Sequence, residues 1–405
     1  MDHVVVVGGS LAGIRGCGGL RANGFEGRIT LVGNELHQPY DRPPLSKKVL
    51  AGEWEPDRIA LMRDGELDGL QLQLRLGVAA TGLDLAARSL ALADGTSLGF
   101  DGLLIATGAA TRRLPGQPEH ESLFELRTLD DSLALRERLR PGGRRVTIIG
   151  AGFIGLEVAA TARTLGNDVV VLEGLPAPLI RGLGADMGMA VTTLHADNGV
   201  DILCSVAVTA IEPSEDGSIT VRLGDGTSIV SDIVVVGIGV APVTGWLAGS
   251  GLELRDGIVC DSTLNAGAHG VYAAGDVARW PNPQFDDEEM RVEHWTNASE
   301  QGLHAAKNMV AVAAGEQPEP YSAVPFFWSE QYGKRIQFIG RAAGDDEVRI
   351  VKGSVEDRAF LALYGKHGRL RGALGLALPK PLMQCRKMLV DRMSFDEAVA
   401  AAGAL

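Results

Sequence analysis

At 405 residues, 45% of them hydrophobic and 22% charged, the chain has a globular composition and is long enough for two or three domains. A formal net charge of −13 disfavours nucleic acid or anionic lipid as partners unless a local basic patch intervenes. The cysteines Cys17, Cys204, Cys260 and Cys385 form no CxxC pair and the histidines show no metal spacing, so we expect no metal site. No apolar run approaches about 18 residues and no basic leader precedes the first strand, which predicts a cytoplasmic protein without a membrane span.

Two segments have the strand–helix–strand order of a βαβ unit. The first is predicted at Val4–Val7, Leu11–Ala22 and Arg28–Val32, and the second at Val146–Ile149, Phe153–Leu165 and Asp168–Leu172. The opening strand of the first unit is wholly apolar and β-branched, which is typical of a strand buried on both faces of a parallel sheet.

The second unit carries the full G-x-G-x-x-G pattern at Gly150, Gly152 and Gly155. The glycines allow a tight turn, close approach of the backbone to a pyrophosphate, and close packing of helix on strand. Glu173 ends the following strand, where a carboxylate accepts hydrogen bonds from ribose hydroxyls and repels a 2′-phosphate. This pattern predicts dinucleotide binding with NADH favoured over NADPH, although Arg181 is close enough in sequence to weaken that preference.

The first unit departs from the pattern. Gly8 and Gly13 match, but Ser10 replaces the middle glycine. A small side chain is tolerable there if its hydroxyl bonds to a phosphate oxygen. Glu35 is the candidate ribose acid, with Asn34 as a competitor. On this motif alone, a plain α/β core stays an alternative.

A longer repetition shows how the two units are arranged. ALADGTSLGFDGLLIATG (Ala91–Gly108) resembles VRLGDGTSIVSDIVVVGIG (Val221–Gly239), and each predicts an Asp-Gly hairpin followed by an apolar strand. The second nucleotide domain is therefore inserted into the first, which Gly270–Ala278 is expected to complete. From about Tyr321 the sequence becomes aromatic and alternating, with strand-like runs at Val348–Lys352 and Ala359–Tyr364 and a helical tail at Leu382–Ala401. This pattern indicates an α+β domain.

These patterns predict an α/β fold with Rossmann-like dinucleotide-binding domains and a C-terminal α+β domain. The predicted boundaries are 1–110 and 238–315 for a discontinuous first domain, 111–237 for the inserted domain and 320–405 for the C-terminal domain.

Further motifs carry a family resemblance. They are PYDRPPLSK (Pro39–Lys47), LLIATGA (Leu103–Ala109), LRT (Leu126–Thr128), VYAAGD ending at Asp276, RVEHWTNASEQG (Arg291–Gly302) and PFFWSEQYG (Pro325–Gly333). Together with the glycine loops, they resemble the FAD-dependent reductases that serve ferredoxin and rubredoxin, the putidaredoxin-reductase-like family. The resemblance covers nearly the whole chain and implies a glutathione-reductase-like fold, with FAD in the first domain and NADH in the inserted one.

The resemblance and the glycine loops together define a set of expected cofactor-binding residues. For FAD they are Gly8, Ser10, Ala12, Gly13, Asn34, Glu35, Arg42, Lys47, Ala80, Ala106, Thr107, Gly108, Arg127, Gly275, Asp276, Glu293, His294 and Trp295. For NADH they are Gly150, Gly152, Phe153, Ile154, Gly155, Glu173, Gly237, Ile238 and Gly239.

The resemblance implies a catalytic role for Lys47, Glu157 and Trp328. Lys47 resembles the family lysine whose ammonium lies near flavin N5, and Glu157 matches the glutamate that pairs with it. Each has a plainer alternative: a solvated surface lysine, a helix first-turn acid, and a core tryptophan. Arg42 and Arg127 are expected to neutralise flavin phosphates or contact the ring edge, or else are surface charges.

The implied activity is transfer of hydride from NADH to FAD and then of single electrons to a [2Fe–2S] ferredoxin that serves a P450 or Rieske-type oxygenase. The alternatives are a rubredoxin reductase, a general NADH diaphorase, or an NADH-sensing flavoprotein of the apoptosis-inducing-factor type. Residues 38–48 contain no cysteine, which argues against disulfide-reductase and cysteine-peroxidase chemistry. We expect a monomer or a homodimer.

Because ferredoxins of this kind are usually acidic, a local basic patch is expected near Trp328. The candidate residues are Arg335, Arg369, Arg371, Lys380, Arg386 and Lys387, which are alternatively ordinary surface charges.

Overall fold

The computed structural model describes residues 1–63 and 65–404, which divide into two compact units. The first unit contains Met1–Asp41, Asp57–Ala110 and Ala241–Pro325, and the second contains Arg42–Pro56, Thr111–Val240 and Phe326–Leu405. The segment Arg42–Pro56 therefore groups with the second unit, although its place in the sequence puts it in the predicted FAD domain. The three-domain division stays a prediction, and Leu405, at the end of the third domain, lies outside the described residues.

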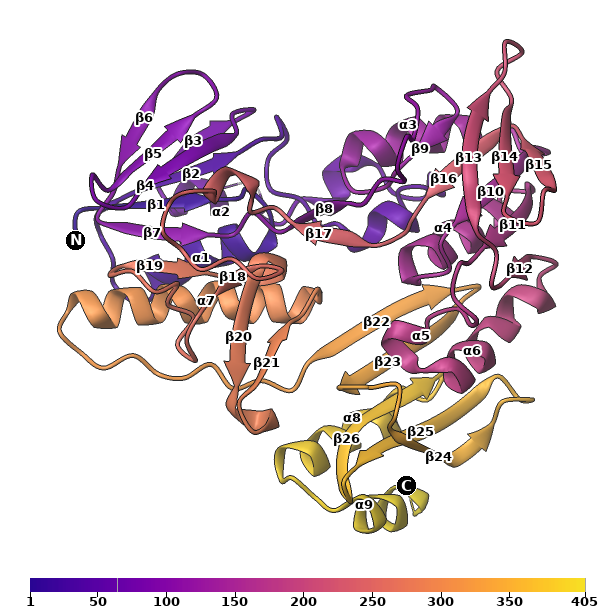
Figure 1. Ribbon diagram of the computed structural model, residues 1–405. Helices are drawn as coiled ribbons and strands as arrows, with labels where there is room; N and C mark the ends of the chain where they lie inside the picture. Colours follow the sequence, from indigo (N-terminus) through magenta and orange to yellow (C-terminus); the bar gives the residue numbers. More distant parts are fainter. Residues whose placement is uncertain (64, 405) are drawn as a thin grey trace. The chain divides into compact units, whose positions relative to one another are not determined.

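A parallel sheet forms the centre of the first unit (Figure 1). Its order is β19-β7-β1-β2-β3, with bounds Val271–Ala273, Gly102–Ile105, His3–Val7, Arg28–Gly33 and Leu72–Leu76. Strands β1 and β7 are buried along their whole length, as expected for strands covered on both faces. Because neighbouring strands run parallel, their carboxyl ends meet at one edge. The pairing of β19 with β7 confirms that the segment after residue 239 completes this unit.

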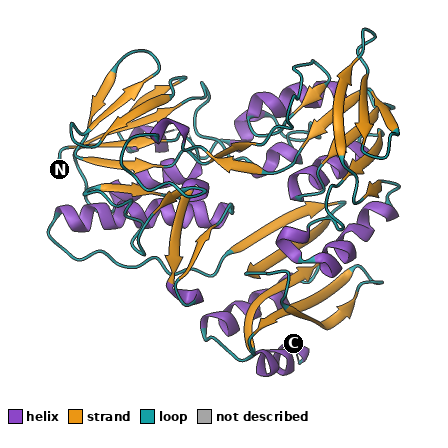
Figure 2. Ribbon diagram, in the orientation of Figure 1, coloured by secondary structure: helices purple, strands orange, loops and turns teal. Residues whose placement is uncertain are grey.

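Helices α1 (Leu11–Ala22) and α7 (Trp295–Ala313) pack against each other in this unit (Figures 1 and 2). A Cβ at Gly302 would lie 2.3 Å from the carbonyl oxygen of Ala12, so the close approach of the helices requires glycine there. The unit also contains α2 (Glu66–Gly69), β4 (Ala80–Asp84), β5 (Ser89–Leu92), β6 (Ser97–Gly99), η3 (Gly245–Leu247), β18 (Ile258–Val259), η4 (Gly275–Val277), β20 (Ala278–Asn282), η5 (Pro283–Phe285) and β21 (Glu288–Arg291). The chain passes between the units within η2 (Pro56–Ile59), β8 (Ala109–Thr111) and β17 (Val240–Pro242).

The second unit repeats the parallel-sheet plan. Its sheet order is β12-β11-β10-β16-β9, with bounds Asp201–Leu203, Asp168–Leu172, Arg145–Ile149, Ile233–Val236 and Leu123–Phe124. The accompanying elements are η1 (Pro43–Ser46), α3 (Leu129–Leu139), α4 (Phe153–Thr164), α5 (Ile180–Leu183), α6 (Ala185–Asp197) and the antiparallel strands β13 (Val208–Pro213), β14 (Ile219–Leu223) and β15 (Ser228–Ser231). Both predicted βαβ units and both Asp-Gly hairpins are confirmed.

An antiparallel sheet completes the second unit. Its order is β22-β23-β26-β25-β24, with bounds Phe326–Gln331, Lys334–Gly340, Arg369–Leu376, Ala359–Lys366 and Glu347–Ser354. Its apolar side chains share one core with the inserted domain, in which Ile148 of β10 and Phe338 of β23 are both buried. This shared core is the physical reason why the antiparallel sheet belongs to the same compact unit.

The predicted helical tail at Leu382–Ala401 is confirmed, and it consists of two helices. The structure has α8 (Pro379–Val390) and α9 (Phe395–Gly403), separated by a turn in which Arg392 adopts a left-handed φ of 54°. Ser394 caps α9 in a capping box with Glu397, a start signal that divides the apparently continuous helical pattern. Among the described helices, none combines the length and apolar content needed to cross a membrane.

Candidate functional site

The loop after β1 has the geometry of a dinucleotide-binding turn. Gly8 has a φ of 124°, and a Cβ there would lie 2.1 Å from the carbonyl oxygen of Ala106. A Cβ at Gly13 would lie 1.9 Å from the carbonyl oxygen of Gly8, so both positions exclude any other residue. Ser10 occupies the N-cap position of α1, where free backbone N–H groups and the helix dipole favour a phosphate.

The ends of β2 and β7 bring further predicted residues to the same edge. Glu35 follows β2 and accepts a hydrogen bond from the hydroxyl of Tyr40, which holds its carboxylate, while Asn34 is exposed. Thr107 follows β7 and donates to the carbonyl of Val243 at 2.9 Å. Of the two candidate residues, Glu35 and Asn34, this arrangement supports Glu35 as the residue that binds the ribose.

The turn after β19 lies against the start of α1. Gly275 has a φ of 79°, and a Cβ there would lie 3.0 Å from the Cβ of Ala12, so the turn with Asp276 stands beside the first glycine loop. The N–H of Gly275 donates to Oε1 of Gln301 at 2.8 Å. Nε2 of Gln301 is buried and has no partner among the described residues. The tight backbone turns that these glycines permit and the buried amide donor of Gln301 fit a bound dinucleotide such as FAD.

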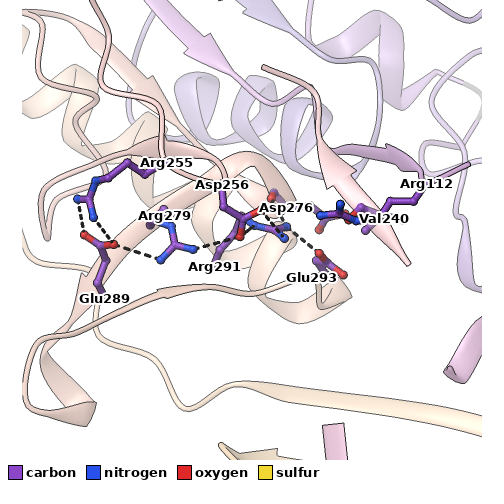
Figure 3. A network of polar contacts seen from close by, with 9 residues as sticks. All are labelled: Arg112, Val240, Arg255, Asp256, Asp276, Arg279, Glu289, Arg291 and Glu293. Atoms are coloured by element: carbon purple, nitrogen blue, oxygen red, sulfur yellow. Dashed lines mark hydrogen bonds and ion pairs between the residues drawn. The ribbon is translucent and has the colours of Figure 1, made fainter. Parts of the chain in front are cut away.

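A network of ion pairs supports the turn at Asp276 (Figure 3). Nη1 of Arg291 donates to the carbonyl of Asp276 at 3.0 Å and contacts Oε1 of Glu293 at 2.7 Å. Nε of Arg291 lies 3.2 Å from Oδ2 of Asp256, which also pairs with Arg279 at 3.1 Å. Because the side chain of Arg291 is only 10% exposed, these contacts hold the main chain at Asp276 in place.

The remaining predicted FAD residues of this unit are also accounted for. His294 is the N-cap of α7, and Nε1 of the neighbouring Trp295 donates to Oδ1 of Asp41 at 2.7 Å. Ala80 begins β4 and is half-buried. The residues Gly8, Ser10, Ala12, Gly13, Asn34, Glu35, Ala80, Ala106, Thr107, Gly108, Gly275, Asp276, Glu293, His294 and Trp295 all belong to the first unit.

The glycine loop of the second unit repeats this geometry. A Cβ at Gly150 would lie 2.4 Å from the carbonyl oxygen of Gly237, and one at Gly155 would lie 2.2 Å from that of Gly150. A Cβ at Gly152 would meet nothing within 4 Å in the described chain, so that face of the loop is open. The carboxylate of Glu173 accepts from the N–H of Ala151 at 2.8 Å, which ties the acid to the loop. This loop therefore also fits a dinucleotide.

Other predicted NADH residues lie around this loop. Phe153 opens α4 and makes an edge contact with Phe327 at 4.8 Å, whereas Ile154 beside it is 49% exposed. Gly237, Ile238 and Gly239 follow β16 directly, at the carboxyl edge of the parallel sheet.

Lys47 and Glu157 form an ion pair inside the second unit. Nζ of Lys47 lies 2.7 Å from Oε2 of Glu157, with the side chains 15% and 3% exposed. Ser46 donates to the same oxygen at 2.5 Å, and Ser329 donates to Oε1 at 2.6 Å. The exposed-lysine alternative therefore fails, because the ammonium is held on a buried, hydrogen-bonded carboxylate.

Arg42, Arg127 and Trp328 also belong to the second unit. Nη1 of Arg42 donates to the carbonyl of Arg127 at 2.5 Å, so the two arginines are neighbours. Trp328 lies on β22, half-buried, with its ring stacked on that of Phe326 at 6.0 Å.

Sequence reasoning missed Arg291, Gln301 and Ser329 as individual site residues. All three lie inside segments that carry the family resemblance. Arg291 is hydrogen-bonded to the carbonyl of Asp276, Gln301 to the N–H of Gly275, and Ser329 to the carboxylate of Glu157. A single sequence gives no spacing signal for such contacts between distant residues.

The two glycine loops, each at the carboxyl edge of a parallel sheet, define a dinucleotide-dependent oxidoreductase. The family model of the pyridine nucleotide-disulphide oxidoreductases matches residues 2–302, and a reductase C-terminal model matches residues 326–404. The chain belongs to this family, in its ferredoxin reductase branch, and is an FAD-dependent oxidoreductase with NADH as co-substrate.

Its relatives match over almost their whole length. The ferredoxin reductase subunit of 5,5'-dehydrodivanillate O-demethylase from Sphingobium sp. (strain SYK-6) is 37% identical over 97% of this chain and 94% of its own. Rhodocoxin reductase from Rhodococcus erythropolis is 36% identical over 98% and 92%. The structure of the covalent putidaredoxin reductase–putidaredoxin complex superposes with a TM-score of 0.92 at 32% identity, covering 100% of this chain and 99% of that one.

Proposed function

We propose that the protein passes electrons from NADH through FAD to a [2Fe–2S] ferredoxin that serves a P450 or Rieske-type oxygenase. The observation that carries the proposal is the end-to-end match to ferredoxin reductases, which includes the C-terminal region at residues 326–404. One relative is by name a subunit of an O-demethylase, and another was solved in complex with putidaredoxin.

In this proposal residues 1–110 and 238–315 hold FAD, residues 111–237 hold NADH, and residues 320–405 form the C-terminal domain. Bound FAD would link a two-electron donor to a one-electron acceptor, because a flavin accepts two electrons as a hydride and releases them one at a time. Lys47 supplies a positive charge that stabilises negative charge on the reduced ring, and Glu157 holds its ammonium in place. Glu173 favours NADH over NADPH by its negative charge.

Cysteine chemistry is not part of the proposal. Cys17, the cysteine closest in sequence to the first glycine loop, is fully buried in α1, and burial raises the pKa of its thiol to about 12. A thiol of that kind packs as a small apolar group and is a poor nucleophile.

Trp328 lies on the face of the antiparallel sheet against which helix α8 packs. Trp328 is opposite Gln337, which is opposite Gly375, so these residues share one face of the sheet. A Cβ at Gly375 would lie 3.2 Å from the Cβ of Leu382, so α8 covers this face.

The predicted basic patch divides into two groups along α8. Lys380 lies at the start of the helix, and the preceding Ala377 donates its N–H to the carbonyl of Arg335. Met393 follows the C-terminal end of α8, and its carbonyl accepts a hydrogen bond from the N–H of Leu370. The second group therefore lies toward the C-terminal end of α8: Arg369, Arg371, Arg386 and Lys387. Only the first group is near the end of β22 that follows Trp328, since Arg335 is opposite Glu330.

Steady-state assays with separate acceptors test the proposal. We expect NADH-dependent reduction of a [2Fe–2S] ferredoxin to exceed that of rubredoxin, quinone and oxygen by at least roughly tenfold in kcat/KM. A faster rate with rubredoxin or with quinone would replace the ferredoxin assignment. Slow turnover with every carrier, accompanied by NADH-dependent dimerisation, would favour the sensing flavoprotein.

A further inference from the structure

A series of buried polar side chains leads away from the Lys47–Glu157 pair. Ser329 and Gln331 lie two residues apart on β22, on the face that points into the core of the second unit, where they are 0% and 1% exposed. Ser329 donates to Oε1 of Glu157 at 2.6 Å, and Nε2 of Gln331 donates to Oγ of Ser329 at 3.2 Å.

The series continues to a buried histidine. Oε1 of Gln331 lies 2.9 Å from Nε2 of His195, which is on α6 and is 0% exposed. Nδ1 of His195 lies 3.2 Å from the hydroxyl of Tyr332, and the rings meet edge-on at 5.1 Å. Tyr332 is half-buried at the turn between β22 and β23, with a φ of 50°.

The chemistry of the groups fixes one direction for these hydrogen bonds. A carboxylate only accepts hydrogen bonds, so the hydroxyl of Ser329 donates its hydrogen to Glu157. The Ser329 oxygen must then accept from the amide nitrogen of Gln331. The amide oxygen of Gln331 then faces His195 and can only accept, so Nε2 of His195 carries the proton. A neutral His195 therefore accepts at Nδ1 from Tyr332, and every donor in the series points toward Glu157.

The apolar surroundings of these side chains argue against a role in packing alone. Phe338, Ile336 and Leu376 of the same core are fully or almost fully buried beside them. Polar groups in such a core cost free energy unless each is hydrogen-bonded, and an apolar side chain would avoid that cost. Aligned hydrogen bonds in a low-dielectric core polarise one another, and here they converge on the acid that holds Lys47.

We propose that Ser329, Gln331, His195 and Tyr332 are positioning residues that fix the Glu157 carboxylate, and through it the Lys47 ammonium, for electron transfer from NADH. The inference rests on the proposed function, because it assigns these residues to the same reaction. It makes the hairpin turn at Tyr332 and the strand that carries Trp328 part of one hydrogen-bonded support for the ion pair.

Anaerobic stopped-flow reduction of the flavin by NADH tests this role. Ser329→Ala and Gln331→Leu are expected to slow reduction at saturating NADH by roughly tenfold, the factor expected when support of a charged group is lost, with the apparent Kd for NADH unchanged. Ser231→Ala is the matched control, because Ser231 is also buried in this unit and its hydroxyl lies 2.6 Å from that of Thr147, away from the Glu157 series. Tyr332→Phe and its control Tyr364→Phe, whose hydroxyl donates to Leu183 at 2.8 Å, keep the test open if an alanine variant does not fold.

A double-mutant cycle separates positioning from general stability. In a Glu157→Gln background, Ser329→Ala is expected to have less than about a twofold further effect, because its action passes through Glu157. Additive losses in that background, or equal losses in Ser231→Ala, would overturn the inference. If NADH does not reduce the wild-type flavin at all, the proposed function fails instead, so the two failures are distinguishable.

Discussion

Glu157 is the residue on which the geometry of the second unit converges. Its carboxylate is 3% exposed and accepts from Ser46, Lys47 and Ser329. A buried ion pair is tolerable only when its remaining lone pairs are used, and removal of one partner leaves a costly uncompensated charge. We therefore infer that the hydrogen bonds from Ser46 and Ser329 allow Glu157 to be buried on α4.

His195 gives a prediction at the same scale. Burial lowers its pKa below the ordinary value of 6.5, an effect that the hydrogen bond with Gln331 partly opposes. Because the folded pKa is depressed, the unfolded chain binds the proton more readily, so this stability is present above about pH 6.5 and is lost as the pH falls toward the folded pKa. Between pH 7 and pH 5 the Tm of the wild type should fall further than that of His195→Gln, measured by calorimetry. Equal slopes in the two proteins would contradict a neutral, buried His195.

The alternation of side chains along strand β22 places its residues on two different faces. Phe327, Ser329 and Gln331 face the core shared with α4, while Trp328 and Glu330 face the side that α8 covers. A shift of one residue in register would exchange these faces, so the pairing with β23 from Phe326↔Ile339 to Gln331↔Lys334 fixes both at once.

Helix α8 gives the prediction for this scale. Lys380→Glu is expected to raise the KM for an acidic ferredoxin by about fivefold at low salt and to weaken its salt dependence, because an exposed charge contributes modestly. Arg369→Glu, at the other end of the basic set, is the control and should change KM by less than about twofold. Equal effects of the two substitutions would place the acceptor elsewhere, and reduction of the flavin by NADH should stay unchanged in both.

The elements that sequence reasoning predicted well have strong local patterns. β11 (Asp168–Leu172) and α1 (Leu11–Ala22) have the predicted bounds, because apolar periodicity and flanking glycines mark both ends. Strand β26 was missed because Gly372 and Gly375 weaken its strand pattern, although close packing against β23 and α8 requires them.

Predictability of the site follows the same rule. The spacing of the glycines predicts both loops, and the family resemblance predicts Lys47 and Glu157. Ser329, Gln331 and His195 are ordinary residues whose role depends on tertiary contact, since β22 and α6 are more than a hundred residues apart in the chain. Only the tertiary fold brings them together.

At the scale of the molecule, the chain consists of a dinucleotide fold inserted into a second copy of itself. The first unit is assembled from three segments, and its parallel sheet is completed by β19, which follows the inserted region. Each copy places a glycine loop at the carboxyl edge of its own parallel sheet. In the proposed function, this duplication gives one chain one loop for FAD and another for NADH.

The most direct test of this account is an anaerobic titration of the purified protein with NADH, followed by flavin absorbance. We predict about one FAD per chain, complete bleaching by about one equivalent of NADH, and recovery of the oxidised spectrum on addition of about two equivalents of oxidised [2Fe–2S] ferredoxin, since the acceptor takes one electron at a time. A colourless protein, a flavin that NADH leaves oxidised, or a reduced flavin that ferredoxin does not reoxidise would contradict it.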